Sequence, residues 1–345
     1  MSPGRVLVVV ATCAGLLAGH AAAQEVTLRV HQFLPSQAPI PSNGIAPWAE
    51  RITAQSDGRI AFEYYPSMQL GGAPAALFDQ ARDGVVDIVW TVLGYTPGRF
   101  PRSEVFELPF LVTTGEATSV AFWDFVEAHA AEEFADVKLL AVHAHGPGVF
   151  HSRTPITRLE DIEGMSVRGG SRVISDMLDR LGADPVSMPV PETSEALARG
   201  VIDATTSPWE VTPSLRIAEL VDHHTGFAGP YGLYTQTFAL VMNRASYESL
   251  PEDLQAIIDA NSGRELARTF GRVMDEADLP GIALAEEEGN SIVTLDANET
   301  ERWRAAAQPT IDAWVEDMTA GGADGQALVD RARELVAEES GLQAP

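Results

Sequence analysis

The sequence has almost no cysteine and almost no lysine. Cys13 is the only cysteine among 345 residues, so the chain cannot form an internal disulfide bond or a zinc site built on cysteine thiolates. Lys138 is the only lysine. Nearly all positive charge is therefore arginine, whose planar guanidinium suits two-pronged recognition of carboxylates. Because no disulfide contributes, the stability of the folded chain must come from its hydrophobic core.

Positive charge is also scarce relative to negative charge. The chain has 23 Lys and Arg against 49 Asp and Glu, which gives a formal net charge of −26 at pH 7. A protein this acidic repels nucleic acid and anionic membrane surfaces, so we expect neither as a partner. The hydrophobic content of 45% and the charged content of 21% are ordinary for a globular protein, and the length is sufficient for two domains.

The amino terminus has the features of a secretory signal peptide. Arg5 supplies the positive charge, residues 6–19 form an apolar segment, and the small residues 21–23 offer a cleavage site before Gln24. The apolar segment is shorter than the roughly 20 residues that span a bilayer. We predict that residues 1–23 are a signal peptide and that the mature protein is exported to the periplasm of a Gram-negative bacterium without being embedded in the membrane.

The rest of the chain alternates strand-like and helical runs. Such alternation predicts an α/β fold with mostly parallel sheets flanked by helices. Beyond Pro251 the sequence is strongly helical, which predicts a long C-terminal helical region. The strand-like runs are residues 26–33, 60–65, 86–91, 139–145, 165–168, 185–188, 201–205 and 237–243.

The strand-like runs fall into two series, which predict two lobes. We place residues 24–145 and about 236–277 in lobe I. Residues 146–235 and about 278–345 form lobe II. No flexible linker separates the two series, so we expect the chain to pass between the lobes along strands.

Several segments, in order along the chain, resemble the substrate-binding proteins of TRAP transporters (tripartite ATP-independent periplasmic transporters). One predicted strand ends at Trp90-Thr91 and opens into a Gly/Pro-rich loop that leads to Leu108-Pro-Phe110. Loops at the carboxyl ends of strands build ligand sites in α/β sheets. The other matching segments are Tyr65-Pro-Ser-Met-Gln-Leu-Gly71, Leu159 to Ser171, Leu181-Gly-Ala-Asp-Pro185, Ala196 to Ala204, Ser207-Pro-Trp-Glu210 and Leu250-Pro-Glu-Asp-Leu-Gln255.

The resemblance implies a two-lobed periplasmic binding protein fold and a receptor function. In this family an organic acid is captured in the cleft between the lobes and delivered to the small and large membrane subunits of the transporter. The resemblance implies a protein that is not an enzyme, with no catalytic residue, no cofactor and no metal.

Arg168 is the strongest candidate for binding the acid. It ends a predicted strand, precedes Gly169-Gly170 and comes just before a predicted helix that begins near Ser171. This arrangement places a guanidinium beside a helix N-terminus, where free N–H groups and the helix dipole also favour an anion. The resemblance implies the same role, because the carboxylate-pairing arginine of the family falls at this position.

The resemblance implies further site residues. Ser207 stands where sialic-acid-binding relatives have an Asn, and Gly148 stands where they have a second arginine, for which Arg153 could partly substitute. Aromatic walls suit ligand rings and sugar faces, so we rank aromatic carboxylates first, then sugar acids, then short hydroxy or keto acids. The remaining residues expected to face the cleft are Phe33, Trp90, Thr91, Trp209 and Tyr234.

Two alternative functions remain open from the sequence. His143 and His145 would share one face of a strand, which is compatible with a metal-dependent hydrolase, but no metalloprotease, nucleophile-elbow or phosphate-loop motif accompanies them. The other alternative is an ABC-type solute receptor of the same architecture. We interpret Glu192 and Glu210 as solvated helix residues.

Overall fold

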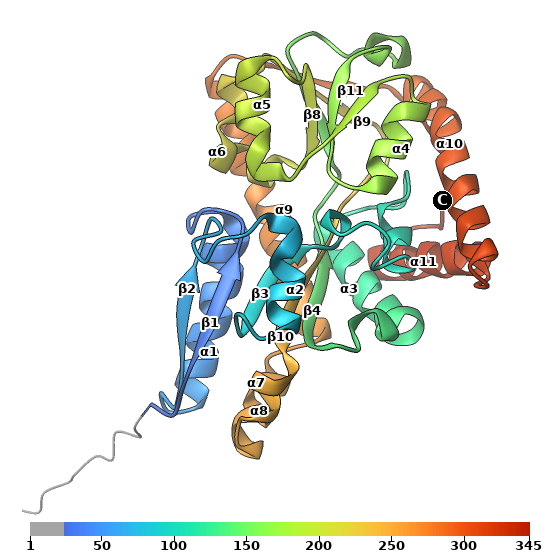
Figure 1. Cartoon of the computed structure of the whole chain (residues 1–345). Coiled ribbons are helices and arrows are strands. Elements are labelled where there is room, and N and C mark those ends of the chain that lie inside the picture. Colours follow the sequence, from blue (N-terminus) through green and yellow to red (C-terminus); the bar gives the residue numbers. More distant parts are fainter. Residues whose placement is uncertain (1–23) are drawn as a thin grey trace, which may run out of the picture.

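The computed structural model describes residues 24–345 and contains two β-sheets flanked by helices (Figure 1). The first sheet has the strand order β2-β1-β3-β10-β4, and the second has the order β11-β9-β5-β8-β6-β7. The strands of the first sheet are β1 (Val26–Gln32), β2 (Ile60–Tyr65), β3 (Ile88–Val92), β4 (Val137–Ala144) and β10 (Thr237–Asn243). Those of the second sheet are β5 (Val149–Ser152), β6 (Ser166–Gly169), β7 (Asp184–Ser187), β8 (Ala204–Ser207), β9 (His223–Phe227) and β11 (Ser291–Leu295).

Strand β10 joins the first sheet from a distant part of the sequence. Strand β1 pairs in parallel with β2 and β3, whereas β10 lies between β3 and β4 and is antiparallel to both. All 7 residues of β10 are buried, as expected for an apolar run in the middle of a covered sheet. The second sheet is also mixed, because β5 is antiparallel to its neighbours β8 and β9.

Helix α4 shows how the helices cover the sheets. It packs on β6 and β7 through the buried residues Val173, Ile174, Met177 and Leu178, which recur at helical spacing. The Ser171 hydroxyl accepts a hydrogen bond from the Ile174 N–H at 3.2 Å and caps the helix N-terminus. The helices are α1 (Ala46–Gln55), α2 (Leu77–Arg82), α3 (Gly115–Phe125), α4 (Arg172–Arg180), α5 (Thr193–Arg199), α6 (Thr212–Leu215), α7 (Arg244–Glu248), α8 (Glu252–Ala260), α9 (Arg264–Glu287), α10 (Ala297–Ala320) and α11 (Gly325–Ser340).

Helix α9 connects the two halves of the molecule (Figure 1). Asp275 accepts hydrogen bonds from the N–H groups of Gly115 and Glu116, at 2.6 and 2.8 Å, at the start of α3. One turn further along, Asp278 accepts a hydrogen bond from the Glu210 N–H at 2.8 Å in a short turn after β8. Helix α9 therefore holds two segments in place: the start of α3 beside the first sheet, and the turn that follows β8 of the second sheet.

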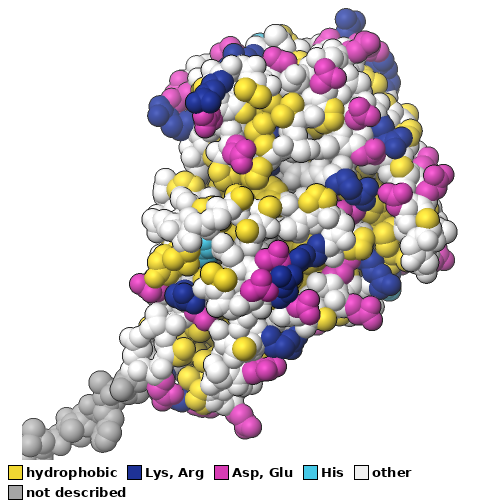
Figure 2. Space-filling model, viewed as in Figure 1, with side chains coloured by type: hydrophobic (Ala, Val, Ile, Leu, Met, Phe, Trp, Pro, Cys, Tyr) yellow, Lys and Arg dark blue, Asp and Glu magenta, His cyan; other side chains and the backbone are white. Residues whose placement is uncertain are grey.

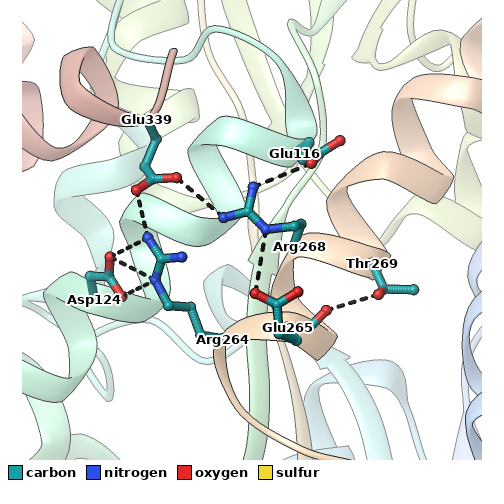
Figure 3. A network of polar contacts seen from close by, with 7 residues as sticks. All are labelled: Glu116, Asp124, Arg264, Glu265, Arg268, Thr269 and Glu339. Atoms are coloured by element: carbon teal, nitrogen blue, oxygen red, sulfur yellow. Dashed lines mark hydrogen bonds and ion pairs between the residues drawn. The ribbon is translucent and has the colours of Figure 1, made fainter. Parts of the chain in front are cut away.

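A network of ion pairs fixes the start of α9 and the end of α11 (Figure 3). Arg264 pairs with Asp124 on α3 at 2.9 Å and with Glu339 on α11 at 2.5 Å. Arg268 pairs with Glu116 at 3.3 Å and with the same Glu339 at 3.4 Å. Because Glu339 bridges both arginines, α11 is held against the first half of the molecule, where it also packs on α3.

The structure confirms the predicted α/β fold class with a long C-terminal helical region, and it adds strands that the sequence pattern did not predict. These strands are β5, β9 and β11. No helix within residues 24–345 is long and apolar enough to cross a membrane. On the face in Figure 2, acidic and basic side chains are interspersed. The predicted signal peptide lies outside the described residues.

Candidate ligand-binding site

A cavity lies between the two sheets, where the chain passes from one to the other. Its volume is about 20 Å³, room for about one water molecule, so its walls must move apart to admit a larger ligand. The lining is largely apolar and aromatic, with a few polar groups. The lining residues are Phe33, Leu34, Trp90, Val92, Tyr95, His145, Arg168, Val190, Ser207, Pro208, Glu210, Val211, Gln236 and Phe238.

Arg168 is the only cation among these lining residues. Its side chain is fully buried, and two of its nitrogens are held by backbone oxygens: Nε donates to Met188 O at 3.1 Å and Nη1 donates to Thr206 O at 3.0 Å. Nη2 has no hydrogen-bond partner, and within residues 24–345 the guanidinium forms no ion pair. A buried cation without a counter-charge is costly, and an anion bound in the cavity would offset that cost.

Aromatic side chains form one wall of the cavity. Phe33 stacks on Trp90 with ring centroids 4.7 Å apart, and Trp90 stacks on Phe238 at 5.4 Å. The Trp90 indole N–H donates to His143 Nε2 at 2.8 Å, which fixes the orientation of the ring. A flat, oriented stack of this kind is suited to the face of another ring.

His143 and His145 are buried and neutral. Burial lowers the pKa of each to about 3. His145 Nε2 accepts a hydrogen bond from the Gln236 N–H at 2.9 Å, and His145 Nδ1 bonds to Gly146 O. Neither nitrogen of the His145 ring is therefore available to a metal. Among the described residues no group of three or more His, Cys, Asp or Glu is arranged to hold a metal ion.

The structure brings together four of the predicted site residues at the cavity: Phe33, Trp90, Arg168 and Ser207. The Ser207 hydroxyl is buried and has no hydrogen-bond partner, so it is available to a ligand. The other four predicted residues do not line the cavity. These are Thr91, Arg153, Trp209 and Tyr234.

Each of these four lies elsewhere for a physical reason. Thr91 follows Trp90 in β3, so its side chain points to the opposite face of the sheet. Trp209 packs against the buried His151 and His224, with ring centroids 5.1 and 4.7 Å away. Arg153 is exposed, and its guanidinium donates to the carbonyl of a residue on α5.

Tyr234 lies behind the cavity wall and accounts for the glycine at position 148. A Cβ atom at Gly148 would lie 2.2 Å from the Tyr234 ring, closer than any real side-chain contact. The Tyr234 ring also meets the His145 ring edge-to-face, with centroids 5.6 Å apart. The position where sialic-acid-binding relatives have a second arginine therefore cannot hold one beside this tyrosine.

Three polar lining residues were missed or misread from the sequence. Tyr95 accepts a hydrogen bond from the Val190 N–H at 2.8 Å, and Gln236 donates to Gly170 O at 2.8 Å. Each of these hydrogen bonds links a segment next to a strand of the first sheet to a segment next to a strand of the second sheet. The interpretation of Glu210 as a solvated helix residue is wrong, because the residue is only 5% exposed and lines the cavity.

Burial raises the pKa of Glu210 to about 8, and the neighbouring Asp278 carboxyl contributes to the increase. The Asp278 pKa is itself raised to about 7 by burial. The interpretation of Glu192 as a solvated residue agrees with its exposed position.

We expect the stability of the protein to be greatest near pH 5–6. Because folding raises the carboxyl pKa values of Glu210 and Asp278, these two groups contribute fully to stability below about pH 4. Their contribution is lost as pH rises through about 8. The lowered pKa values of His143 and His145 act in the opposite direction: stability is present above about pH 6.5 and is lost as pH falls through about 3. Calorimetric Tm values between pH 3 and pH 9 test this, and a Tm that continues to rise above pH 7 would contradict it.

A family model of known proteins matches most of the chain. The model for bacterial extracellular solute-binding proteins, family 7, aligns with residues 32–317. The chain belongs to this family. The similar proteins with solved structures are TRAP solute-binding proteins. The chain is therefore a TRAP solute receptor. TRAP receptors of this family are periplasmic.

Three similar solved structures were obtained with aromatic acids. A TRAP solute-binding protein from Rhodoferax ferrireducens T118, in complex with copurified benzoate, is 47% identical with a TM-score of 0.90, over 92% of this chain and 99% of that one. One from a marine metagenome, in complex with 3-hydroxybenzoate, is 44% identical with a TM-score of 0.90 over 92% and 99%. One from Bordetella bronchiseptica, with bound mandelate, is 32% identical with a TM-score of 0.84 over 91% and 99%.

These comparisons confirm the prediction of a TRAP solute receptor that is not an enzyme. They contradict both alternatives that the sequence left open. The hydrolase built on His143 and His145 is wrong because the family consists of solute receptors. The ABC-type receptor is wrong because the matching family and its solved members are of the TRAP type.

Proposed function

We propose that this TRAP receptor binds an aromatic monocarboxylate in the cavity between the two sheets, with the ligand carboxylate on Arg168. The observation that carries the proposal is the buried Arg168 guanidinium, which has no counter-charge and one unpartnered nitrogen, Nη2. The stack of Phe33, Trp90 and Phe238 provides a flat surface for the ligand ring. The benzoate, 3-hydroxybenzoate and mandelate complexes of similar proteins support this ligand class.

The proposed site comprises the lining residues that can touch such a ligand. Arg168 binds the carboxylate, the stack of Phe33 and Trp90 contacts the ring from one side, and Ser207 supplies a free hydroxyl. No metal or cofactor takes part in the proposal, because one guanidinium and neutral donors suffice to hold a monocarboxylate.

The proposed mechanism is closure of two lobes around the acid, followed by delivery to the small and large TRAP membrane subunits. Lobe I comprises residues 24–145 and about 236–277, and lobe II comprises residues 146–235 and about 278–345, with α11 returning to pack on α3 of lobe I. A ligand that contacts both lobes favours the closed state by its difference in affinity for the two states.

Titration of the purified protein with benzoate is the direct test of this function. Isothermal titration calorimetry should give saturable binding with one ligand per chain, and benzamide, which carries no charge, should bind far more weakly. Saturating benzoate should also raise Tm, since a ligand at 100 times its Kd stabilises the folded state by about 2.7 kcal/mol. Absence of binding by a panel of benzoates and phenylacetates would overturn the proposal.

We further propose that residues 1–23 are a signal peptide and that the mature protein in the periplasm begins near Gln24. Intact-mass measurement of the protein from a periplasmic extract is expected to give the mass of residues 24–345. The mass should not change on reduction, because the mature chain contains no cysteine. A lipid-modified species that retains Cys13 would contradict this prediction.

A further inference from the structure

Glu210 is the one acidic side chain among the residues that line the cavity. Its side chain is buried with 5% exposure, and within residues 24–345 its carboxyl group forms no ion pair and accepts no hydrogen bond from another residue. A buried carboxyl group without a partner is as costly as a buried cation without one. The cavity is therefore lined by one cation, Arg168, and one carboxyl group, that of Glu210.

The position of Glu210 is fixed by the surrounding backbone. The residue lies in the short 3₁₀ turn Trp209–Val211, directly after Pro208, and its N–H is held by Asp278 at 2.8 Å. Helix α9 approaches this turn so closely that a Cβ atom at Gly281 would lie 2.2 Å from the Trp209 carbonyl oxygen. The turn cannot shift without moving α9, so the carboxyl group is presented from a rigid support.

Glu210 also borders a second, outer hollow. That hollow is lined by Gln37, Asn43, Pro213 and Glu276, among others, and none of its lining residues is a Lys or Arg. The outer hollow thus offers no positive charge that could pair with a second anionic group of a ligand. The positive charge of the inner cavity is limited to Arg168, which the ligand carboxylate occupies in the proposed function.

We propose that Glu210 is the specificity-determining residue of the site: it hydrogen-bonds a hydroxyl group on the ring of the bound acid and rejects acids that carry a second carboxylate. This inference rests on the proposed function. A hydroxyl group is both a donor and an acceptor, so it pairs with the glutamate side chain in either protonation state. A second carboxylate would be desolvated next to an acidic group with no cation to compensate for it.

The inference assigns distinct tasks to the residues of the cavity. Arg168 selects a ligand with a negative charge, and the stack of Phe33 and Trp90 selects a flat ring. Glu210 selects the substituent on that ring: it favours a hydroxyl group and disfavours a second carboxylate. A site with a buried hydrogen-bonding group discriminates strongly against analogues that leave that group unpaired. The preference for a hydroxylated ring should therefore be measurable on one protein as the ratio of its affinities for a hydroxy acid and for benzoate.

The test compares four kinds of acid by calorimetry: benzoate, the three monohydroxybenzoates, phenylacetate and benzene-1,3-dicarboxylate. On the parent protein, the tightest of the monohydroxybenzoates should bind at least about tenfold more tightly than benzoate, as expected for one hydrogen bond to a buried partner. The dicarboxylate should bind at least about a hundredfold more weakly than benzoate.

Two variants separate the effects of charge and of hydrogen bonding. Glu210→Gln keeps the shape and the hydrogen-bonding groups but removes the acid. At pH 9, above the Glu210 pKa of about 8, the ratio of benzoate to dicarboxylate affinity should therefore fall by about tenfold or more. Glu210→Leu also removes hydrogen bonding, so the preference for the hydroxy acid over benzoate should disappear. The matched control is Glu192→Gln, an exposed glutamate outside the cavity, and both ratios should remain within about twofold of the parent.

The outcomes distinguish this inference from the proposed function. If the parent binds benzoate but Glu210→Gln changes both ratios by less than about twofold, a difference well under 1.4 kcal/mol, the role of Glu210 is refuted and the proposed function stands. If the parent binds none of the aromatic acids, the proposed function itself fails. Circular dichroism confirms folding. Because Glu210→Gln is nearly isosteric, it tests the rejection of the dicarboxylate even where Glu210→Leu does not fold.

Discussion

Arg168→Ala is expected to weaken benzoate binding by at least about thirtyfold, a cost on the order of 2–5 kcal/mol for leaving a buried carboxylate unpaired. Two guanidinium nitrogens are already held by Met188 O and Thr206 O, so Nη2 is oriented before the ligand arrives. Preorganisation of this kind reduces the entropy cost of binding. Calorimetry on the folded variant measures the loss directly.

Two further variants show whether the effect belongs to the fork of the guanidinium. Arg168→Lys should recover only part of the affinity, because a single ammonium cannot keep the two backbone hydrogen bonds of the guanidinium and also present an N–H where Nη2 lies. The matched control is Arg153→Ala, which removes an exposed arginine that lies outside the cavity. If Arg168→Ala binds benzoate within about twofold of the parent, the carboxylate does not bind at Arg168.

Gly271→Ala is expected to destabilise the protein by about 2 kcal/mol or more, because it overpacks a backbone contact. A Cβ atom at this position would lie 2.3 Å from the carbonyl oxygen of Gly115 and 2.6 Å from the hydroxyl oxygen of Ser119. Alanine in the middle of a helix normally stabilises by up to about 1 kcal/mol relative to glycine. The close approach of α9 to α3 reverses that sign, and Tm should fall by roughly 5 °C.

The control for this prediction is a glycine with room for a methyl group. Gly321, at the end of α10, has a negative φ of −75° and no atom closer than 3.4 Å to a built Cβ. Gly321→Ala should change the free energy of unfolding by no more than about 0.5 kcal/mol. A Gly271→Ala protein with the Tm of the parent would show that α9 and α3 can separate at little cost.

The predicted site residues that line the cavity are those whose positions are determined by neighbouring residues. Arg168 lies at the end of β6 just before a capped helix, an arrangement visible as Val-Arg-Gly-Gly-Ser in the sequence. Phe33 lies just beyond the end of β1, and Trp90 lies in the middle of β3, which extends to Val92. Ends of strands in α/β sheets can be located from hydrophobic pattern alone.

The parts that were missed depend on contacts between distant residues. The residues next to Glu210 in the sequence predict a solvated side chain, and it is buried only because Asp278, 68 residues later, brings α9 against its turn. Strand β11 is short and mostly exposed, and it becomes a strand by pairing with β9. Trp209 faces away from the cavity because it lies in the same tight turn as Glu210, and no local pattern predicts which side chain of a turn faces inward.

The position of β10 in the middle of the first sheet has a consequence for how the chain folds. Its seven buried residues, Thr237–Asn243, lie between β3 and β4, although almost a hundred residues of the second sheet separate it from β4 in sequence. Until Asn243 has been synthesised, the facing edges of β3 and β4 have no partner strand and remain open to misassociation. Pairings between residues so far apart in the chain are slow to form, since the loop must close before the contacts stabilise it. A chain that stops short of β10 therefore lacks the central strand that joins β3 to β4.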